Sequence, residues 1–325
     1  MDIEILLFLQ NIREALGPLF ARLAAYASDG ITAIAIVIPF VTYWCLNKRR
    51  GQTMIAVLAG SLMLNQIIKL GAAVYRPWVR DARIVPASFA RRSATGYSFP
   101  STHTQIAASA YGDLAIENRK SHPGRAAVYF ALILIAGVLR MFLGVHTPQD
   151  ILVGMLSALL MIPVCYFVFE KISKHDEQEF IFATVFVFAC AAAITFALTK
   201  NYPMDYVDGE LLVDPQEMIK DFMLSAGLSV SMVIGGIIEH RTVRFSTECT
   251  TQRKVIRVIS GLAMIALIYL LTKLSASFIP QLANALIRGL LMGFYAVLIH
   301  PFLFTKAEEK WNSVPSQESI TPPKF

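Results

Sequence analysis

The feature that most constrains this chain is a series of apolar runs, each long enough to cross a lipid bilayer. Hydrophobic residues make up 55% of the 325 residues, charged residues only 16%, and the mean hydropathy is +0.55. A membrane-spanning helix needs about 20 apolar residues, and several runs approach that length without the alternation typical of strands. Because lipid offers no partners to backbone polar groups, the pattern predicts an all-α, polytopic membrane helical bundle.

The expected helices divide the chain into a core, a lobe and a tail. We expect a six-helix core over residues 1–172, about four extra transmembrane helices over 173–304, and a disordered cytoplasmic tail over 305–325, which is rich in Pro, Ser and Glu. The first core helix contains Arg13 and Arg22, so it either spans obliquely or lies in the membrane interface. The helices are expected at 3–26, 30–46, 53–75, 101–117, 126–143 and 150–170, then at 180–198, 218–238, 255–271 and 284–304.

The net charge of +6 is explained by membrane topology rather than by nucleic acid, which we do not expect as a partner. Alternation of the spans places the basic clusters at 48–50, 119–125 and 241–257 on one side, and the positive-inside bias makes that side cytoplasmic. The loop 76–100 and the turn 144–149 lie on the opposite side. The four cysteines are scattered and show neither a disulfide framework nor a metal-binding spacing.

The loop at 76–100 is itself rich in arginine, against the positive-inside bias. Such a loop on the translocated side suggests that its arginines serve a ligand. Four of them have two equally good explanations, because they either steer anionic headgroups or face solvent and lipid headgroups. These four are Arg80, Arg83, Arg91 and Arg92.

Three polar clusters end on the same expected, non-cytoplasmic face of the bundle. They are Lys69 and Arg76 in KLGAAVYRP, Ser101 and His103 in SFPSTH, and Arg140, His146 and Asp150 in LRMFLGVHTPQD. Titratable groups at the ends of apolar runs are costly unless they pair or face a wet cavity, so they indicate a functional site. Three cations that converge with the amide groups at a helix start favour an anion, and phosphate fits best.

Two histidines and a carboxylate extend this pattern from binding to a reaction. One neutral imidazole can attack phosphorus if Asp150 holds its other ring nitrogen, and the second imidazole can protonate the departing oxygen. The cations would stabilise charge on the equatorial oxygens of the transition state, as magnesium does elsewhere. We therefore expect neither a metal nor a cofactor.

These clusters resemble the three motifs of the type 2 phosphatidic acid phosphatase superfamily, which also contains the vanadium haloperoxidases: K-x6-R-P, P-S-G-H and S-R-x5-H-x3-D. The resemblance implies that His146 is the nucleophile that forms a phosphohistidine, that Asp150 orients it, and that His103 is the general acid. It also implies that the phosphoryl group is held by Lys69, Arg76, Ser101, the backbone amide of Thr102, and Arg140.

Two positions depart from the family pattern. Thr102 stands where the family usually has glycine, and Leu139 replaces the serine before the motif arginine. The P-S-T-H form and the extra helices resemble the sphingosine-1-phosphate phosphatase branch. The resemblance covers about residues 3–170 and leaves the last lobe without a role.

Together these features predict a metal-independent phosphatase of a lipid phosphate or diphosphate, integral to the plasma membrane, with its site on the non-cytoplasmic face. A reticulum membrane fits the same topology. The expected partners are the bilayer and the lipid phosphate substrate. The sequence does not decide whether that substrate is phosphatidate, a sphingoid phosphate or a polyprenyl diphosphate. Two other functions also fit: a transporter or lipid-binding protein with a non-catalytic phosphate pocket, and a vanadate-dependent haloperoxidase. The sequence predicts no oligomeric state.

Overall fold

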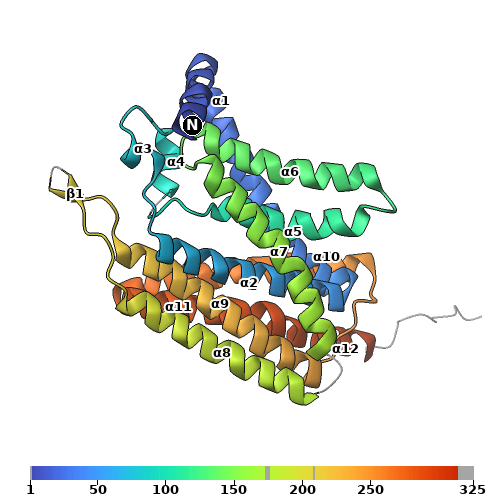
Figure 1. Ribbon diagram of the computed structural model, residues 1–325. Helices are drawn as coiled ribbons and strands as arrows, with labels where there is room; N and C mark the ends of the chain where they lie inside the picture. Colours follow the sequence, from blue (N-terminus) through green and yellow to red (C-terminus); the bar gives the residue numbers. More distant parts are fainter. Residues whose placement is uncertain (1, 95, 173–175, 208, 314–325) are drawn as a thin grey trace, which may run out of the picture.

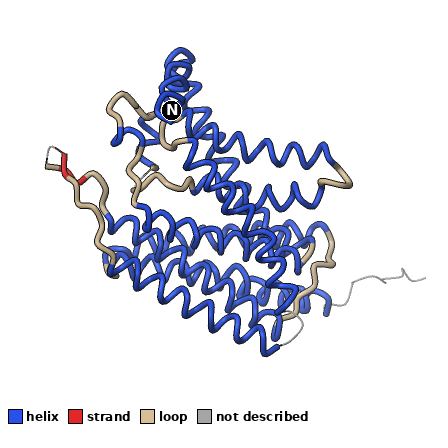
Figure 2. Tube along the Cα trace, viewed as in Figure 1, coloured by secondary structure: helices blue, strands red, loops and turns tan. Residues whose placement is uncertain are grey.

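The chain folds into a bundle of long helices, as the computed structural model shows (Figures 1 and 2). The structure describes residues 2–94, 96–172, 176–207 and 209–313. Within these ranges, eight helices are long and apolar enough to cross a membrane. The predicted all-α, polytopic bundle is therefore confirmed.

The first half of the chain holds five long helices and two short ones. Its elements are α1 (Asp2–Val41), the π-helical turn η1 (Thr42–Leu46), α2 (Lys48–Ala72), α3 (Pro77–Arg80), α4 (Ser88–Ser93), α5 (Thr102–Asn118), α6 (Pro123–Phe142) and α7 (Pro148–Ile172).

The second half adds a helical lobe and one very short antiparallel strand pair. Its elements are α8 (Asp176–Thr199), β1 (Tyr206–Val207), β2 (Glu210–Leu211), α9 (Pro215–Thr242), α10 (Thr251–Leu274), η2 (Ser275–Ser277), α11 (Gln281–Phe294), η3 (Tyr295–Ile299) and α12 (His300–Ser313).

The prediction of two helices at 3–26 and 30–46 with a connection between them is wrong, because α1 runs through 27–29 and continues to Val41, where the π-helical turn η1 follows. The break in α1 lies at Gly17, whose φ of 83° is costly for any residue with a Cβ atom. Pro18 follows, and its fixed φ and missing N–H suit the first turn of the next helical segment. At 28–30 the helix continues, because Ser28 is buried and its carbonyl accepts a hydrogen bond from Thr32 Oγ1 at 2.9 Å.

The segment of α1 before Gly17 packs on the arginine-rich loop. Arg80 pairs with Asp2 at 2.9 Å, and Arg83 pairs with Glu4 at 3.2 Å and with Asp81 at 2.8 Å. These two arginines thus face carboxylates of the protein itself, which supports the solvated-loop explanation for them over the steering of headgroups.

Helix α5 is the centre of the first half and is surrounded by α1, α2, α6 and α7 (Figure 1). Its inner positions carry small side chains, and Ala107, Ala108 and Ala110 are almost completely buried. Small residues let helix backbones approach one another closely in a membrane protein. This packing fixes the start of α5, where the SFPSTH motif lies.

Helix α9 is the centre of the second half and lies against α2, α8 and α11. Gly227 of α9 and Gly289 of α11 face each other so closely that a Cβ atom on either would overlap the other helix's backbone. On the side of α2, Met218 and Phe222 share one apolar cluster with Leu70 and Tyr97. The added lobe therefore packs directly behind the ends of the SFPSTH and KLGAAVYRP motifs.

A buried polar network joins the two halves at the opposite end of the bundle. Glu239 of α9 is completely buried and accepts hydrogen bonds from Lys48 Nζ at 2.7 Å and from Tyr43 Oη at 3.2 Å. Trp44 donates to the carbonyl of Ala296 at 2.9 Å. Glu239 thus joins α9 to η1 and to the start of α2 as a partner between helices.

The expected tail begins later than residue 305, because α12 continues to Ser313. Glu308 in this helix pairs with the buried Arg257 of α10 at 2.8 Å, which anchors the helix. The remainder of the expected tail, 314–325, lies outside the described residues. All four cysteines are free, and Cys249, between α9 and α10, is the one that is partly exposed.

Candidate functional site

Four helix ends meet at one end of the bundle, near α3 and α4 at the left of Figure 1. They are the last turns of α2 and α6 and the first turns of α5 and α7. Two backbone hydrogen bonds join the connecting segments: Ser98 N donates to Val74 O at 2.8 Å, and Ser101 N donates to Asp150 O at 2.9 Å. The three motifs, far apart in the sequence, are thereby brought to one place as expected.

His146 lies just before α7 and forms a buried pair with Asp150 in the first turn of that helix. His146 Nδ1 lies 3.2 Å from Asp150 Oδ2, and each residue is 2% exposed. The same carboxylate oxygen accepts a hydrogen bond from the backbone N–H of Thr147 at 2.8 Å and one from the hydroxyl of Ser98. Three donors thus fix this carboxylate against the imidazole.

Arg76 fixes the tautomer of His146. Its Nη1 lies 3.0 Å from His146 Nε2, and a guanidinium can only donate, so Nε2 must carry a lone pair and Nδ1 the proton given to Asp150. Burial, and then the charge of Arg76, holds the pKa of His146 well below its ordinary value of 6.5. The arrangement therefore presents a neutral imidazole whose Nε2 carries the lone pair and faces Arg76.

Two buried guanidinium groups lie in this site. Arg76 is 5% exposed and also donates to the carbonyls of Gly96 at 3.1 Å and Val145 at 3.0 Å. Arg140 is 2% exposed, and its Nε has no hydrogen-bond partner among the described residues. A buried donor without a partner is costly, so an anion bound beside Arg140 would be stabilised.

Lys69 is held by the residue that departs from the family pattern. Its Nζ donates to Thr102 Oγ1 at 3.1 Å, and Thr102 Oγ1 donates in turn to Asn65 Oδ1 at 3.0 Å. Asn65 is anchored through Gln105 at 2.6 Å. The expectation for Thr102 was a phosphate-binding amide, and the structure adds a side chain that orients the lysine.

Ser101 and His103 lie in the first turn of α5, as the sequence predicted. Ser101 is completely buried, and its hydroxyl oxygen caps the helix by accepting from Thr104 N at 3.4 Å and Thr104 Oγ1 at 3.1 Å. His103 Nε2 lies 3.1 Å from Oδ1 of Asp29, and this oxygen is 4.0 Å from Arg140 Nη1. The carboxylate of Asp29, which lies outside the three motifs, thus contacts both His103 and Arg140.

The sequence interpretation missed two residues of this site, Ser98 and Asp29. Ser98 is the first residue of SFPSTH, but it lies two residues before Pro100, where the family motif begins, and so was given no role. Asp29 is an isolated acid between two apolar stretches, which by itself indicates function in a membrane helix, but it was assigned to a connection between helices.

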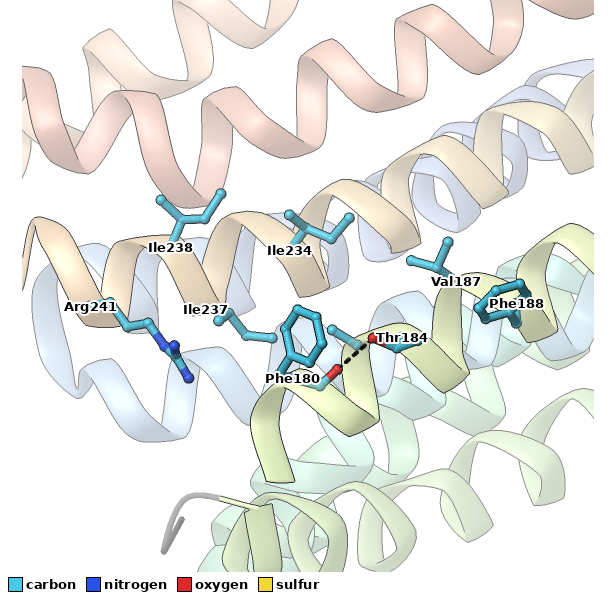
Figure 3. A pocket seen from close by; sticks show the side chains of 9 residues that line it. Phe180, Thr184, Val187, Phe188, Ile234, Ile237, Ile238 and Arg241 are labelled. Carbon is cyan, nitrogen blue, oxygen red and sulfur yellow. Dashed lines mark hydrogen bonds between the residues drawn. The ribbon is translucent and has the colours of Figure 1, made fainter. Parts of the chain in front are cut away.

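A large groove elsewhere on the lobe contains none of the candidate residues. Figure 3 shows this groove, of about 400 Å³, lined by apolar side chains of α8 and α9 such as Phe180, Phe188 and Ile234, with Arg241 at one end. An apolar groove on lipid-facing helices suits an acyl chain rather than chemistry. The candidate site is therefore identified by its polar geometry, not by its volume.

The family comparison agrees with this geometry. Residues 50–174, which contain all three motifs, match the sequence model described as "PAP2 superfamily". This part of the chain is a PAP2 superfamily domain. Residues 223–310 match a second model, "PAP2 superfamily phosphatase, transmembrane extension", which covers most of the added lobe.

Two curated relatives carry the name sphingosine-1-phosphate phosphatase 2. The chain is 24% identical to the protein from Mus musculus over 174 residues, which are 52% of this chain and 46% of the relative. It is 25% identical to the protein from Homo sapiens over 208 residues, 62% of this chain and 48% of the relative. The chain thus spans about half the length of the curated relatives it matches. No solved structure matches it significantly.

Proposed function

We propose that this integral membrane protein is a metal-independent phosphatase that hydrolyses a lipid phosphate or lipid diphosphate through a phosphohistidine. The observation that carries the proposal is the state of His146, whose Nδ1 is held by Asp150 while its Nε2 lone pair faces Arg76. A buried neutral imidazole among cations is arranged to attack an anionic phosphorus centre.

In the proposed first step, His146 Nε2 attacks phosphorus and the bond from phosphorus to the lipid oxygen breaks. His103 gives its proton to that oxygen, and Asp150 stabilises the positive charge that develops on His146. Lys69, Arg76 and Arg140 stabilise the equatorial oxygens, with the start of α5 adding backbone donors. In the second step water attacks the phosphohistidine, His103 takes the proton from water, and phosphate leaves.

A lipid substrate is supported by the place of the site at the ends of membrane helices. A tail can stay in the bilayer while its headgroup reaches the four helix ends. The names of the curated relatives favour a sphingoid-base phosphate, as does the P-S-T-H form of the second motif. We further propose that the site faces the non-cytoplasmic side of the plasma membrane, because the basic clusters at 48–50, 119–125 and 241–257 lie at the other helix ends.

The first test is phosphate release by the purified chain from a panel of sphingoid, phosphatidate and polyprenyl phosphates, with chelator present. We expect release that chelator does not reduce and that vanadate inhibits. A binding protein or transporter would release no phosphate, and a metal-dependent enzyme would lose its activity when chelator is added. A haloperoxidase would oxidise halide when given vanadate and peroxide.

The second test is His146→Ala, which we expect to reduce phosphate release more than about 1,000-fold, because no other side chain replaces the nucleophile. Folding is checked by the thermal unfolding midpoint in detergent, which should remain near that of the parent. Near-normal turnover by a folded His146→Ala protein would contradict the mechanism.

A further inference from the structure

Asp29 is a carboxylate that none of the three motifs contains, yet it lies in direct contact with the candidate general acid. Its Oδ1 is 3.1 Å from His103 Nε2 and 4.0 Å from Arg140 Nη1. The Asp29 side chain is 57% exposed and that of His103 26% exposed, so the pair borders solvent. The pair formed by His146 and Asp150, in contrast, is almost completely buried.

The position of Asp29 is fixed by the packing of α1 on α5. Ser28 is completely buried, and α1 is helical through Asp29. Tyr111 of α5 donates to Ile31 O at 2.9 Å, and thus ties α1 to the same helix that carries His103. The packing of these two helices therefore fixes the backbone from which Asp29 reaches His103.

The charges that act on His103 come from three helices: Asp29 of α1, Lys69 of α2 and Arg140 of α6. Burial, and then the two cations, oppose a positive charge on the imidazole, and Asp29 is the carboxylate that acts against them. A general acid must carry a proton at the start of the reaction. Without Asp29, the cations that bind phosphate would work against the protonated state that the same reaction needs.

The two ring nitrogens of His103 are in different surroundings. Nε2 is held by Asp29, whereas Nδ1 has no hydrogen bond with any residue in the described part of the chain. A protonated imidazole donates from both nitrogens. With Nε2–H given to Asp29, Nδ1–H remains for a departing oxygen.

We propose that Asp29 is the positioning residue of the general acid: it orients His103 through Nε2 and favours the protonated imidazole, so that the Nδ1 proton passes to the leaving lipid oxygen. This inference rests on the proposed phosphatase function and deepens it. In the step, the bond from phosphorus to the lipid oxygen breaks, the proton moves from Nδ1 to that oxygen, and His103 becomes neutral while Asp29 keeps its charge.

The test compares two esters that differ in their need for a general acid. One is a long-chain alkyl phosphate, whose alkoxide must be protonated as it leaves; the other is a nitrophenyl phosphate with a chain of equal length, whose phenolate leaves unaided. We compare kcat/KM, which reports the steps through cleavage of the bond from phosphorus to the leaving oxygen and not the later attack of water. We expect Asp29→Asn to lower kcat/KM on the alkyl ester about 10- to 100-fold, within the range that a general acid contributes. On the nitrophenyl ester the change should stay below about threefold, because that leaving group needs no proton.

Two further measurements separate positioning from a structural effect. Because a carboxylate favours the protonated imidazole, the alkaline limb of the kcat/KM profile should move to lower pH in Asp29→Asn and return in Asp29→Glu. In a His103→Gln background, Asp29→Asn should cause no further loss on the alkyl ester. Asp2→Asn, which removes a carboxylate elsewhere on α1, should leave both esters unchanged.

The proposal is overturned if Asp29→Asn slows both esters by the same factor, or if its effect adds fully to that of His103→Gln. If the Asp29→Asn protein does not fold, Asp29→Glu decides the question. An unchanged alkaline limb together with a loss of activity on the alkyl ester alone supports the proposal. An equal loss of activity on both esters overturns it. If the parent chain hydrolyses neither ester nor any lipid phosphate, the proposed function fails and the inference fails with it.

Discussion

Replacement of Thr102 by valine tests how Lys69 is held. Valine has nearly the shape of threonine, so Thr102→Val removes a hydroxyl without opening a cavity. The hydroxyl accepts from Lys69 Nζ at 3.1 Å and donates to Asn65 Oδ1 at 3.0 Å. A hydrogen bond to a charged group contributes about 1.5–3 kcal/mol. Lys69 is only 5% exposed, so water cannot easily replace the lost partner.

If that contribution supports Lys69 in the transition state, its loss lowers kcat/KM about 10- to 150-fold, since about 1.4 kcal/mol corresponds to a factor of ten. The assay is phosphate release from a lipid phosphate in detergent micelles at low substrate concentration. Thr102→Ser keeps the hydroxyl and should stay near the parent. Thr53→Val is the matched control, because Thr53 is a buried threonine at the far end of α2 that donates to Arg49 O at 3.1 Å. A Thr102→Val protein within about twofold of the parent would refute the reasoning.

Three further predictions follow from the same contacts. Burial holds the pKa of His146 well below 6.5, so its neutral form persists as the pH is lowered. The pH profile of kcat/KM should therefore show no fall with an apparent pKa near 6.5 on its acid side. Such an acid limb would contradict the assignment of His146 as the nucleophile. Ser98→Ala removes a hydrogen-bond donor to Asp150, so kcat should fall about 5- to 30-fold with little change in KM. A change in KM alone would argue against a role of Ser98 in orienting the Asp150 carboxylate. Glu239→Gln weakens the interaction with Lys48, which is partly exposed, and should lower the free energy of unfolding by about 1–3 kcal/mol. Thermal melts measure that loss, and turnover assays should give a kcat near that of the parent. An unchanged melting midpoint would be evidence against a stabilising role of this network.

Much of the candidate site could be predicted because its residues are fixed by short spacings at helix ends. His146 and Asp150 are four residues apart at the start of α7, so a short stretch of backbone keeps them close. Lys69 lies in the last turn of α2, and Arg76 follows shortly after the end of that helix. The apolar runs predicted the bundle for an equally local reason, since crossing a bilayer demands length and composition but no particular partner.

What the sequence could not provide are contacts between distant segments. Asp29 meets His103 across 74 residues, and Ser98 meets Asp150 across 52, with no local pattern linking either pair. The prediction of where α1 breaks was wrong for a related reason. Both Gly17 and the segment at 28–30 are weak helix formers, and only the burial of Ser28 against neighbouring helices decides that the break falls at Gly17.

The cysteines have a practical consequence for determining which way the chain crosses the membrane. Cys45, Cys165 and Cys190 are buried, whereas Cys249 is partly exposed between α9 and α10. That connection lies at the opposite helix ends from the candidate site. A membrane-impermeant maleimide therefore has one preferred target on the unmodified protein, and the side from which it labels sealed vesicles identifies the side that the site does not face.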